Sequence, residues 1–589
     1  MASKVNVKFV AILVGVLILL AGAVGGAAML VLFKSAEELA AQGDAFMQAG
    51  NAVEAEKAYA KAVNKERTNP EYLRKWRDSI GQVIPKTQTL FDSKYPQYTQ
   101  VRKTLADLLR TDVAAHRDYL DTLMEMLGAG YNRQLCEQIA QSATDALLQF
   151  GETKQGGESD VLKRYRALAN LRIMTEARNL NPEAEQGIRT DFEAALAADP
   201  GDVDSVIGLQ TWYMYQADMA IRGERLDEGN KLAEQGRKIV REFRAKDPSE
   251  PKTALAQLSW LLTDARRQAQ AMSNPSDRRK LADQLRNDAA KGLAEAGAVF
   301  ASADPKRIDA QTLSQFTFLE LSLDDSGKLT QSRAALERAI QARPTDASLL
   351  MTRAEAETLA REFEAAIATL QQVRDLPNPT INVQGKLLWF RKNEALFRQA
   401  AICLRAWEYA SEQDPAKLKQ IRSEWLEKGK ARRAELAKIE PEGSIRLQFV
   451  DGKIKLAEDD FLNAQRLLLG YLAGVGEQDA DALFSAAKAS AQLNQPGKAR
   501  ELLEKALAIN PGNITAMLLL GEVEIRLRNV ERAKQLYQMA SEMLPGNETI
   551  EKRLLTIEQE LGEKAVTDPI AKVIAEARAK QDAGDEQGA

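Results

Sequence analysis

The sequence has little of the material from which catalytic and metal sites are usually built. Its 589 residues include only two cysteines, Cys136 and Cys403, and one histidine, His116. The cysteines stand far apart and outside any C-x-x-C pair, so they form no metal or redox motif, and their spacing does not decide whether they pair. We interpret both as small apolar packing residues. His-based zinc sites, Ser-His-Asp triads and Cys-His dyads therefore have at most one histidine to draw on, and we expect it to pack or to face solvent.

Motifs for phosphate, hydrolase and calcium chemistry are also missing. The sequence contains no G-x-x-x-x-G-K-[ST] loop, no G-x-G-x-x-G after a strand, no G-x-S-x-G, no H-E-x-x-H and no EF-hand loop. Acidic neighbours such as Glu458-Asp459-Asp460 do occur, but consecutive residues on a helix do not point at one another. We therefore expect no catalytic residue, no cofactor and no metal ion, and we predict that the protein is not an enzyme.

The composition predicts an all-α protein. Aromatic residues make up only 6% of the chain, and β-branched runs are almost absent after the first thirty residues, while Ala, Leu, Glu, Lys, Arg and Gln dominate. The chain is several times the usual domain length, so it must be divided into domains or built by repetition. The 80 basic and 84 acidic residues nearly cancel, so charge does not indicate binding to nucleic acid.

One long apolar run lies near the N-terminus. From Phe9 to Phe33 no residue is charged or strongly polar, and a helix of this length crosses the roughly 30 Å hydrocarbon core of a bilayer. We predict a single transmembrane signal anchor over 9–33, after a short cytoplasmic N-terminus over 1–8. A cleaved signal peptide is the alternative, because Ala21-Gly22-Ala23 has the form of a cleavage site. The apolar run, however, continues for ten residues beyond it.

The flanking charges predict an orientation for this anchor. Lys4 and Lys8 precede the run, whereas Lys34 is the only basic residue in the stretch that follows it. The positive-inside rule then places the N-terminus in the cytoplasm and the rest of the chain in the periplasm of a bacterium, with the anchor in the inner membrane. Gly22 and Gly26 form a G-x-x-x-G pair through which two transmembrane helices could contact. A homodimer or higher oligomer is therefore left open.

An internal repeat follows the apolar run. Near the C-terminus four residues recur 34 positions later: Ala499, Leu503, Ala506 and Pro511 correspond to Ala533, Tyr537, Ala540 and Pro545. Small residues let two helices touch, a large apolar residue fills the gap to the next repeat, and a proline ends the second helix. The period therefore predicts stacked helical hairpins.

In this pattern the chain resembles the tetratricopeptide repeat family. That family places Leu-Gly or a similar pair in the first helix of each hairpin, where Leu520-Gly521 and Ala486-Ala487 stand here. The resemblance implies an α-solenoid of tetratricopeptide-like hairpins over 34–561 and a polar tail over 562–589. The signature is clearest in 36–70, 313–344, 347–379, 480–511 and 514–545, and a segment such as 86–150 is interpreted as degenerate hairpins.

The resemblance also implies a function. Stacked hairpins form a concave surface lined by their first helices, which binds proteins or peptides. The groove-facing positions of the family fall on Lys488, Gln492, Glu522 and Arg526, our candidate partner-binding residues. We expect a membrane-anchored protein–protein interaction scaffold of the bacterial envelope. A self-assembling structural component of the envelope is the alternative. An enzyme on a closed α/α toroid is less favoured, because aromatics are few and the period is 34 residues.

Overall fold

The structure is a computed structural model. It describes residues 34–83, 88–127, 132–151, 157–177, 182–271, 275–323, 328–376, 388–475, 479–510, 512–543 and 547–567. These residues form 25 α-helices and one 3₁₀ helix, without a β-strand among them, which confirms the prediction of an all-α chain. The predicted anchor Phe9–Phe33, with Gly22 and Gly26, lies outside the described residues. Within the described ranges, no helix combines the length and the apolar character that a membrane span needs.

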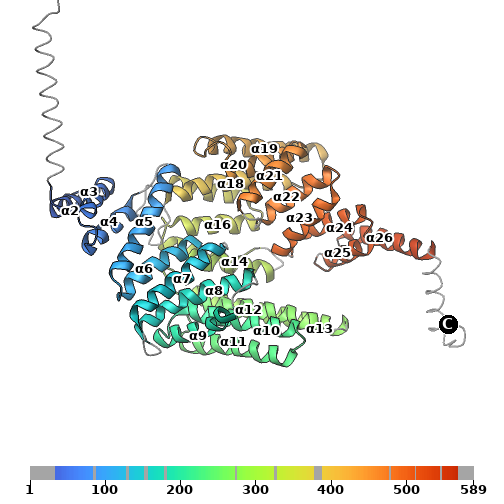
Figure 1. The fold of residues 1–589 in the computed structure, drawn as a ribbon. Coiled ribbons are helices and arrows are strands. Elements are labelled where there is room, and N and C mark those ends of the chain that lie inside the picture. The colour runs from blue at the N-terminus through green and yellow to red at the C-terminus, as the bar shows by residue number, and fades with distance from the viewer. Residues whose placement is uncertain are drawn as a thin grey trace, which may run out of the picture. The chain divides into compact units, whose positions relative to one another are not determined.

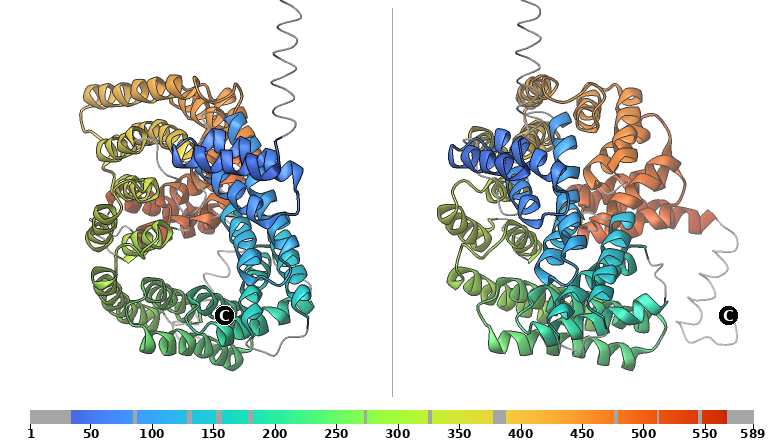
Figure 2. Two further views of the ribbon diagram at one scale, coloured as in Figure 1. Left: turned by 90° about the vertical axis from the view of Figure 1, so that its left-hand side faces the viewer. Right: turned by 60° about the vertical axis from the view of Figure 1, so that its left-hand side comes forward.

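The chain divides into two compact units, Met1–Ala360 with Asp375–Lys392 and Arg361–Arg374 with Asn393–Ala589. In unit 1 the helices pair into hairpins, and from residue 163 onward the first helices of successive hairpins also contact one another (Figures 1 and 2). These first helices are α2 (Ala36–Gln48), α4 (Pro70–Gln82), α6 (Val113–Leu127), α8 (Lys163–Ala177), α10 (Val203–Arg222), α12 (Pro251–Ala271), α14 (Ala310–Leu323) and α16 (Ala347–Leu359). The second helices are α3 (Ala52–Lys65), α5 (Gln88–Leu108), α7 (Arg133–Phe150), α9 (Pro182–Ala198), α11 (Leu226–Lys246), α13 (Pro275–Ser302) and α15 (Thr330–Ala342), and η1 (Glu158–Leu162) precedes α8.

Unit 2 repeats this arrangement. It contains most of α17 and α18, followed by hairpins α20/α21, α22/α23 and α24/α25, whose neighbouring helices contact one another. Its helices are α17 (Phe363–Asp375), α18 (Leu388–Tyr409), α19 (Pro415–Leu436), α20 (Ile445–Ala457), α21 (Phe461–Val475), α22 (Ala480–Gln492), α23 (Pro496–Ile509), α24 (Ile514–Arg526), α25 (Val530–Met543) and α26 (Glu548–Thr567). Each unit is therefore a solenoid of helical hairpins.

Small residues hold the two helices of a hairpin together. A Cβ atom at Gly43 would lie 2.4 Å from the ring of Tyr59, and one at Gly521 would lie 2.5 Å from the ring of Tyr537. Only glycine allows helices to approach this closely at these two positions. The alanines predicted to lie at helix contacts, Ala499, Ala506, Ala533 and Ala540, are all fully buried. The repeat register predicted from the sequence is confirmed at these positions.

The turns inside the hairpins share one backbone conformation. Glu224, Asp459, Asn494 and Arg528 have φ between 55° and 64°, and Gly50 has φ of 71° at the corresponding turn. In each case the next amide donates to a carbonyl five residues earlier, as Gln495 N does to Ser490 O at 2.9 Å. This is the geometry that ends a helix with a left-handed residue and satisfies its last carbonyls. These five hairpins are therefore closed by contacts local in sequence.

One arrangement of an acid, a tyrosine and a cation, here called the polar staple, joins consecutive helices at two places along the chain. The Tyr59 hydroxyl donates to Asp44 at 2.7 Å, and Lys75 Nζ of the next first helix donates to the other Asp44 oxygen at 2.9 Å. In unit 2 the Tyr537 hydroxyl donates to Glu522 at 2.7 Å, and Arg553 donates to both Glu522 oxygens. An acid, a tyrosine and a cation thus tie three consecutive helices together.

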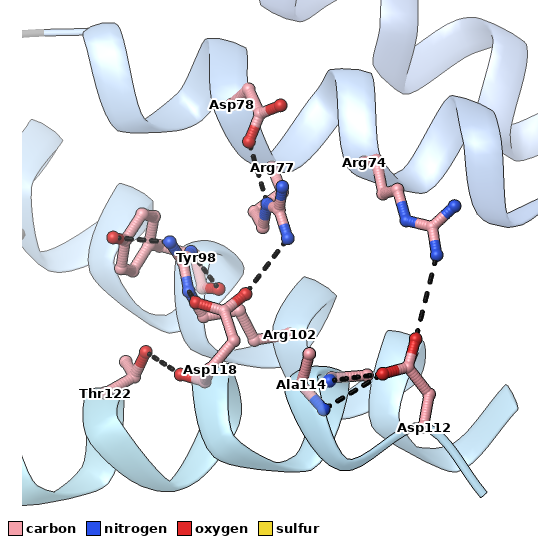
Figure 3. Close-up of polar contacts among 10 residues, drawn as sticks. Arg74, Arg77, Asp78, Tyr98, Arg102, Asp112, Ala114, Asp118 and Thr122 are labelled. Atoms are coloured by element: carbon pink, nitrogen blue, oxygen red, sulfur yellow. Dashed lines mark hydrogen bonds and ion pairs between the residues drawn. The ribbon is translucent and has the colours of Figure 1, made fainter. Parts of the chain in front are cut away.

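A different set of contacts joins α4, α5 and α6, where the repeat signature is weak. Asp118 on α6 accepts hydrogen bonds from Arg77 on α4 at 3.1 Å and from Arg102 on α5 at 2.9 Å (Figure 3). The guanidinium of Arg102 also lies 3.5 Å from the ring centroid of Tyr98. The carboxylate of Asp118 is partly buried and pairs with two cations, so it stabilises the helix contacts more than an isolated surface ion pair would. Ion pairs here take the place of the small-residue contacts seen elsewhere.

The cysteines and the histidine have packing roles. Cys136 and Cys403 are buried free thiols, and burial raises the pKa of Cys403 to about 11. A thiol of that kind is protonated and unreactive at neutral pH. His116 is also buried, with Nε2 at 3.0 Å from the Arg110 carbonyl and its ring edge-on to Phe150.

Candidate partner-binding groove

Four consecutive first helices of unit 1 enclose a groove of about 810 Å³. The helices are α10, α12, α14 and α16, which follow one another from green to yellow-green in Figures 1 and 2. Because neighbouring first helices pack side by side, each contributes one face to a shared surface. The apolar part of this surface is made by Ile207, Met214, Leu255, Phe318, Leu319 and Leu359. The groove has the size and the largely apolar wall of a ligand-binding site.

Phe318 is the most exposed large apolar side chain of this surface, with 58% of its area accessible. Its neighbour two positions earlier, Phe316, is fully buried and stacks on Phe300 with ring centroids 4.3 Å apart. Two residues on a helix point about 200° apart, so α14 sends one phenylalanine into the core and the other into the groove. An aromatic ring left exposed in a concave surface is typical of an anchor for a partner side chain.

The polar wall of the groove consists mainly of hydroxyl and amide groups. They belong to Gln210, Thr211, Ser259, Ser314, Gln315, Thr317 and Thr352. The hydroxyl groups of Thr211, Ser314, Thr317 and Thr352 already donate to main-chain carbonyls or to Glu355. They can therefore accept hydrogen bonds, and the side-chain amides can both donate and accept. Trp260 also lines the groove and is 6% exposed, and its indole N–H has no acceptor among the described residues. A buried donor without a partner costs about 1–3 kcal/mol.

The charges at the groove are unequal. Lys252 Nζ lies 3.3 Å from Asp204 and 3.4 Å from Asp309. Burial alone would lower the pKa of Lys252, but these two carboxylates raise it overall, so the lysine stays charged. Glu355 is exposed on α16, accepts a hydrogen bond from the Ser314 hydroxyl at 3.2 Å, and has no cationic partner in the described part of the chain. Two carboxylates thus flank the one ammonium group, and the third, Glu355, pairs with a hydroxyl group.

The predicted partner-binding residues lie elsewhere, in unit 2. Lys488 and Gln492 are on α22, and Glu522 and Arg526 are on α24. Lys488 Nζ lies 5.5 Å from the ring centroid of Trp407, and Gln492 is exposed. Glu522 belongs to the staple with Tyr537 and Arg553, while Arg526 donates to the Ala491 carbonyl at 2.9 Å. The last two side chains therefore also contribute to the packing of neighbouring helices.

The first helices of unit 2 contain a buried ion cluster. Lys453 on α20 is 1% exposed and donates to Glu408 on α18 at 2.9 Å, and on α22 to Asp481 at 2.8 Å and Ser485 at 3.1 Å. One ammonium group thus connects three consecutive first helices. A buried lysine is tolerated only because all three of its N–H donors have acceptors.

The groove residues of unit 1 were missed by the sequence interpretation. A signal was present in the segment Phe316-Thr317-Phe318-Leu319, which is apolar on opposite sides of one helix. A helix that packs against a single core has one apolar stripe. Two apolar sides therefore indicate a second surface for a ligand or partner.

The geometry described above agrees with a comparison to known families. Residues 490–551 match the family model for the tetratricopeptide repeat. The matched segment is 62 residues long. It includes the end of α22, the whole of α23, α24 and α25, and the start of α26. No curated protein sequence matches the chain.

Solved structures also match the chain, and three of them are as follows. Yeast Tom70 is 10% identical, with 92% of this chain and 99% of that chain covered and a TM-score of 0.34. The Cut9–Hcn1 hetero-tetramer of the APC/C is 11% identical, with 90% and 98% covered and a TM-score of 0.30. A tetratricopeptide repeat protein from Parabacteroides merdae is 14% identical, with 46% and 93% covered and a TM-score of 0.29.

Proposed function

We propose that this chain is a protein–protein interaction scaffold whose unit 1 groove binds a segment of a partner protein. The observation that carries the proposal is the groove itself, in which the exposed ring of Phe318 lies among backbone-compatible hydroxyl and amide groups. The tetratricopeptide repeats at residues 490–551 support it, because stacked helical repeats present extended binding surfaces. Lys488, Gln492, Glu522 and Arg526 are proposed as further contacts on unit 2.

Site-specific crosslinking tests the groove. A photoreactive amino acid at position 318 should capture a partner segment, and mass spectrometry should place the crosslink between that segment and α14. The matched control is the same amino acid at position 242 on α11, where the Glu242 side chain is 62% exposed and lies outside the groove. Capture at position 242 with none at position 318 would move the binding surface away from the groove.

We propose further that Phe9–Phe33 anchors the scaffold in the inner membrane of a bacterium, with the helical repeats in the periplasm. The support is the uninterrupted apolar run and the lysines before it. The alternative of a self-assembling envelope component is tested by light scattering on the detergent-solubilised protein. A scaffold predicts a monomer or a small oligomer, whereas a lattice component predicts a large assembly.

A further inference from the structure

We propose that the unit 1 groove selects a partner segment that combines apolar side chains with arginine or lysine. This inference rests on the proposed function and adds the chemistry of the partner. It follows from the arrangement of Phe318, Glu355 and the carboxylates around Lys252.

The first step concerns the available charge. The charged residues that line the groove are Lys252 and the exposed Glu355. Asp204 and Asp309 flank Lys252 beside the lining, with side chains 46% and 31% exposed. Lys252 already lies between two carboxylates. An acidic partner segment would therefore meet excess negative charge, while a cationic one would meet a complementary field.

The second step concerns the position of Glu355 relative to Phe318. Ser314 on α14 donates a hydrogen bond to Glu355. Phe318 follows Ser314 by four residues on the same helix, so the side chains of Ser314 and Phe318 lie one helical turn apart on the same face, with Cβ atoms about 5–6 Å apart. An arginine that reaches Glu355 therefore passes close to the ring of Phe318. A guanidinium can lie on an aromatic face and pair with a carboxylate at the same time.

The third step concerns the apolar part of the segment. Met214, Leu319 and Leu359 are half-buried in the groove wall, so aliphatic side chains next to the cation would complete their burial. Apolar contact supplies affinity, and the carboxylates reject segments of the wrong charge. The preferred ligand is thus an apolar peptide with a basic residue at its centre.

Three synthetic peptides of equal length test the inference. They share alternating leucine and serine residues and differ at the central positions, which hold arginine, glutamine or glutamate. Affinity is measured by fluorescence anisotropy for the wild type, Glu355→Gln and Phe318→Ala, with Glu242→Gln as the control that removes the same charge from α11. Circular dichroism of each variant checks that the exposed substitutions leave the fold intact.

We expect the arginine peptide to bind most tightly and the glutamate peptide most weakly. Glu355→Gln should lower the affinity for the arginine peptide about fivefold, which corresponds to a charge pair worth about 1 kcal/mol. It should leave the affinity for the glutamine peptide unchanged. Phe318→Ala should lower the affinity for both the arginine and the glutamine peptide, and Glu242→Gln should change neither affinity. Raising the salt concentration should weaken only the arginine peptide.

The outcomes separate this inference from the proposed function. Equal binding of the arginine and glutamate peptides, or an equal loss in Glu355→Gln and Glu242→Gln, would refute charge selection. If those peptides still crosslink to position 318, the groove remains a binding site and only its selectivity is wrong. If no peptide binds and no partner crosslinks at position 318, both proposals fail.

Discussion

Replacement of Lys453 by methionine should destabilise unit 2 strongly. Methionine has a similar length and no charge, so it removes the ammonium group without opening a large cavity. It leaves the carboxylates of Glu408 and Asp481, with side chains 11% and 31% exposed, facing one another without their cation. One oxygen of Glu408 already has no partner among the described residues, so the cluster has no spare donor to replace the lysine.

The expected loss follows from this geometry. Removal of one partner from a buried ion pair costs about 3–5 kcal/mol, because a buried charge is left uncompensated. Asp481 is partly exposed and also feels the charge of Arg405, which places the estimate near the lower end, at about 3 kcal/mol. Hydrogen exchange measured by mass spectrometry on α20 and α22 gives the free energy of local opening.

The pH dependence provides a second test. Burial alone would raise the pKa of Asp481, but Lys453 and Arg405 hold it below the usual 3.8. In the wild type, the stability from this carboxylate is therefore present above pH 3.8 and lost as the pH falls through the folded pKa. Without Lys453 the pKa of Asp481 should instead be raised, since burial and the neighbouring carboxylate of Glu408 both disfavour its charge. The difference between wild type and Lys453→Met should therefore shrink from pH 7 toward pH 4.

A triple variant completes this test. Adding Glu408→Gln and Asp481→Asn to Lys453→Met removes the uncompensated charge, so the triple variant should lose less stability than Lys453→Met alone. A loss below about 1 kcal/mol in the single variant, the value of a surface pair, would show that the cluster is not buried in solution. A larger loss in the triple variant than in the single one would refute the electrostatic explanation.

The remaining predictions concern packing and the membrane. Gly521→Ala should lower the melting temperature of unit 2, because its Cβ would lie 2.5 Å from the Tyr537 ring, whereas Gly497→Ala meets no atom within 4 Å and should not; equal effects would contradict the close contact. Ala540→Leu, at a fully buried site, should cost about 1–3 kcal/mol by overpacking, and a neutral result in urea unfolding would show that the site is not packed. If Phe9–Phe33 is an uncleaved anchor, the protein should stay in the membrane pellet in carbonate and keep its N-terminus, and Edman sequencing that begins near residue 24 would exclude this.

The helical class and the packing of the C-terminal repeats could be predicted because both are encoded locally. Ala499, Ala506, Ala533 and Ala540 reveal their burial through a fixed 34-residue spacing. The staple could have been predicted in the same way, since Gly43, Asp44, Tyr59 and Lys75 have the same spacing as Gly521, Glu522, Tyr537 and Arg553.

The groove and the buried ion cluster could not be predicted, because they depend on helices far apart in the sequence. Thr211 and Glu355 line one groove although they are separated by three hairpins of unequal length. The helix α13, for example, has 28 residues and α15 has 13, so no fixed period connects the faces of α10 to α16. Nothing in the sequence around Lys453 likewise distinguishes it from a surface lysine, and only the approach of α18 and α22 removes it from solvent.

The left-handed turns that close the hairpins have a mechanical consequence. Five hairpins are closed locally by these turns, and helices contact mainly their neighbours. When a force is applied to the two ends of the chain, we therefore expect the outermost hairpins, which have a neighbour on one side only, to unfold first. In an optical trap the chain should lengthen in a series of small steps, rather than in one cooperative rupture. The staples of Asp44 with Tyr59 and Lys75, and of Glu522 with Tyr537 and Arg553, join the outermost hairpins to their neighbours. They would set the force at which this stepwise extension begins.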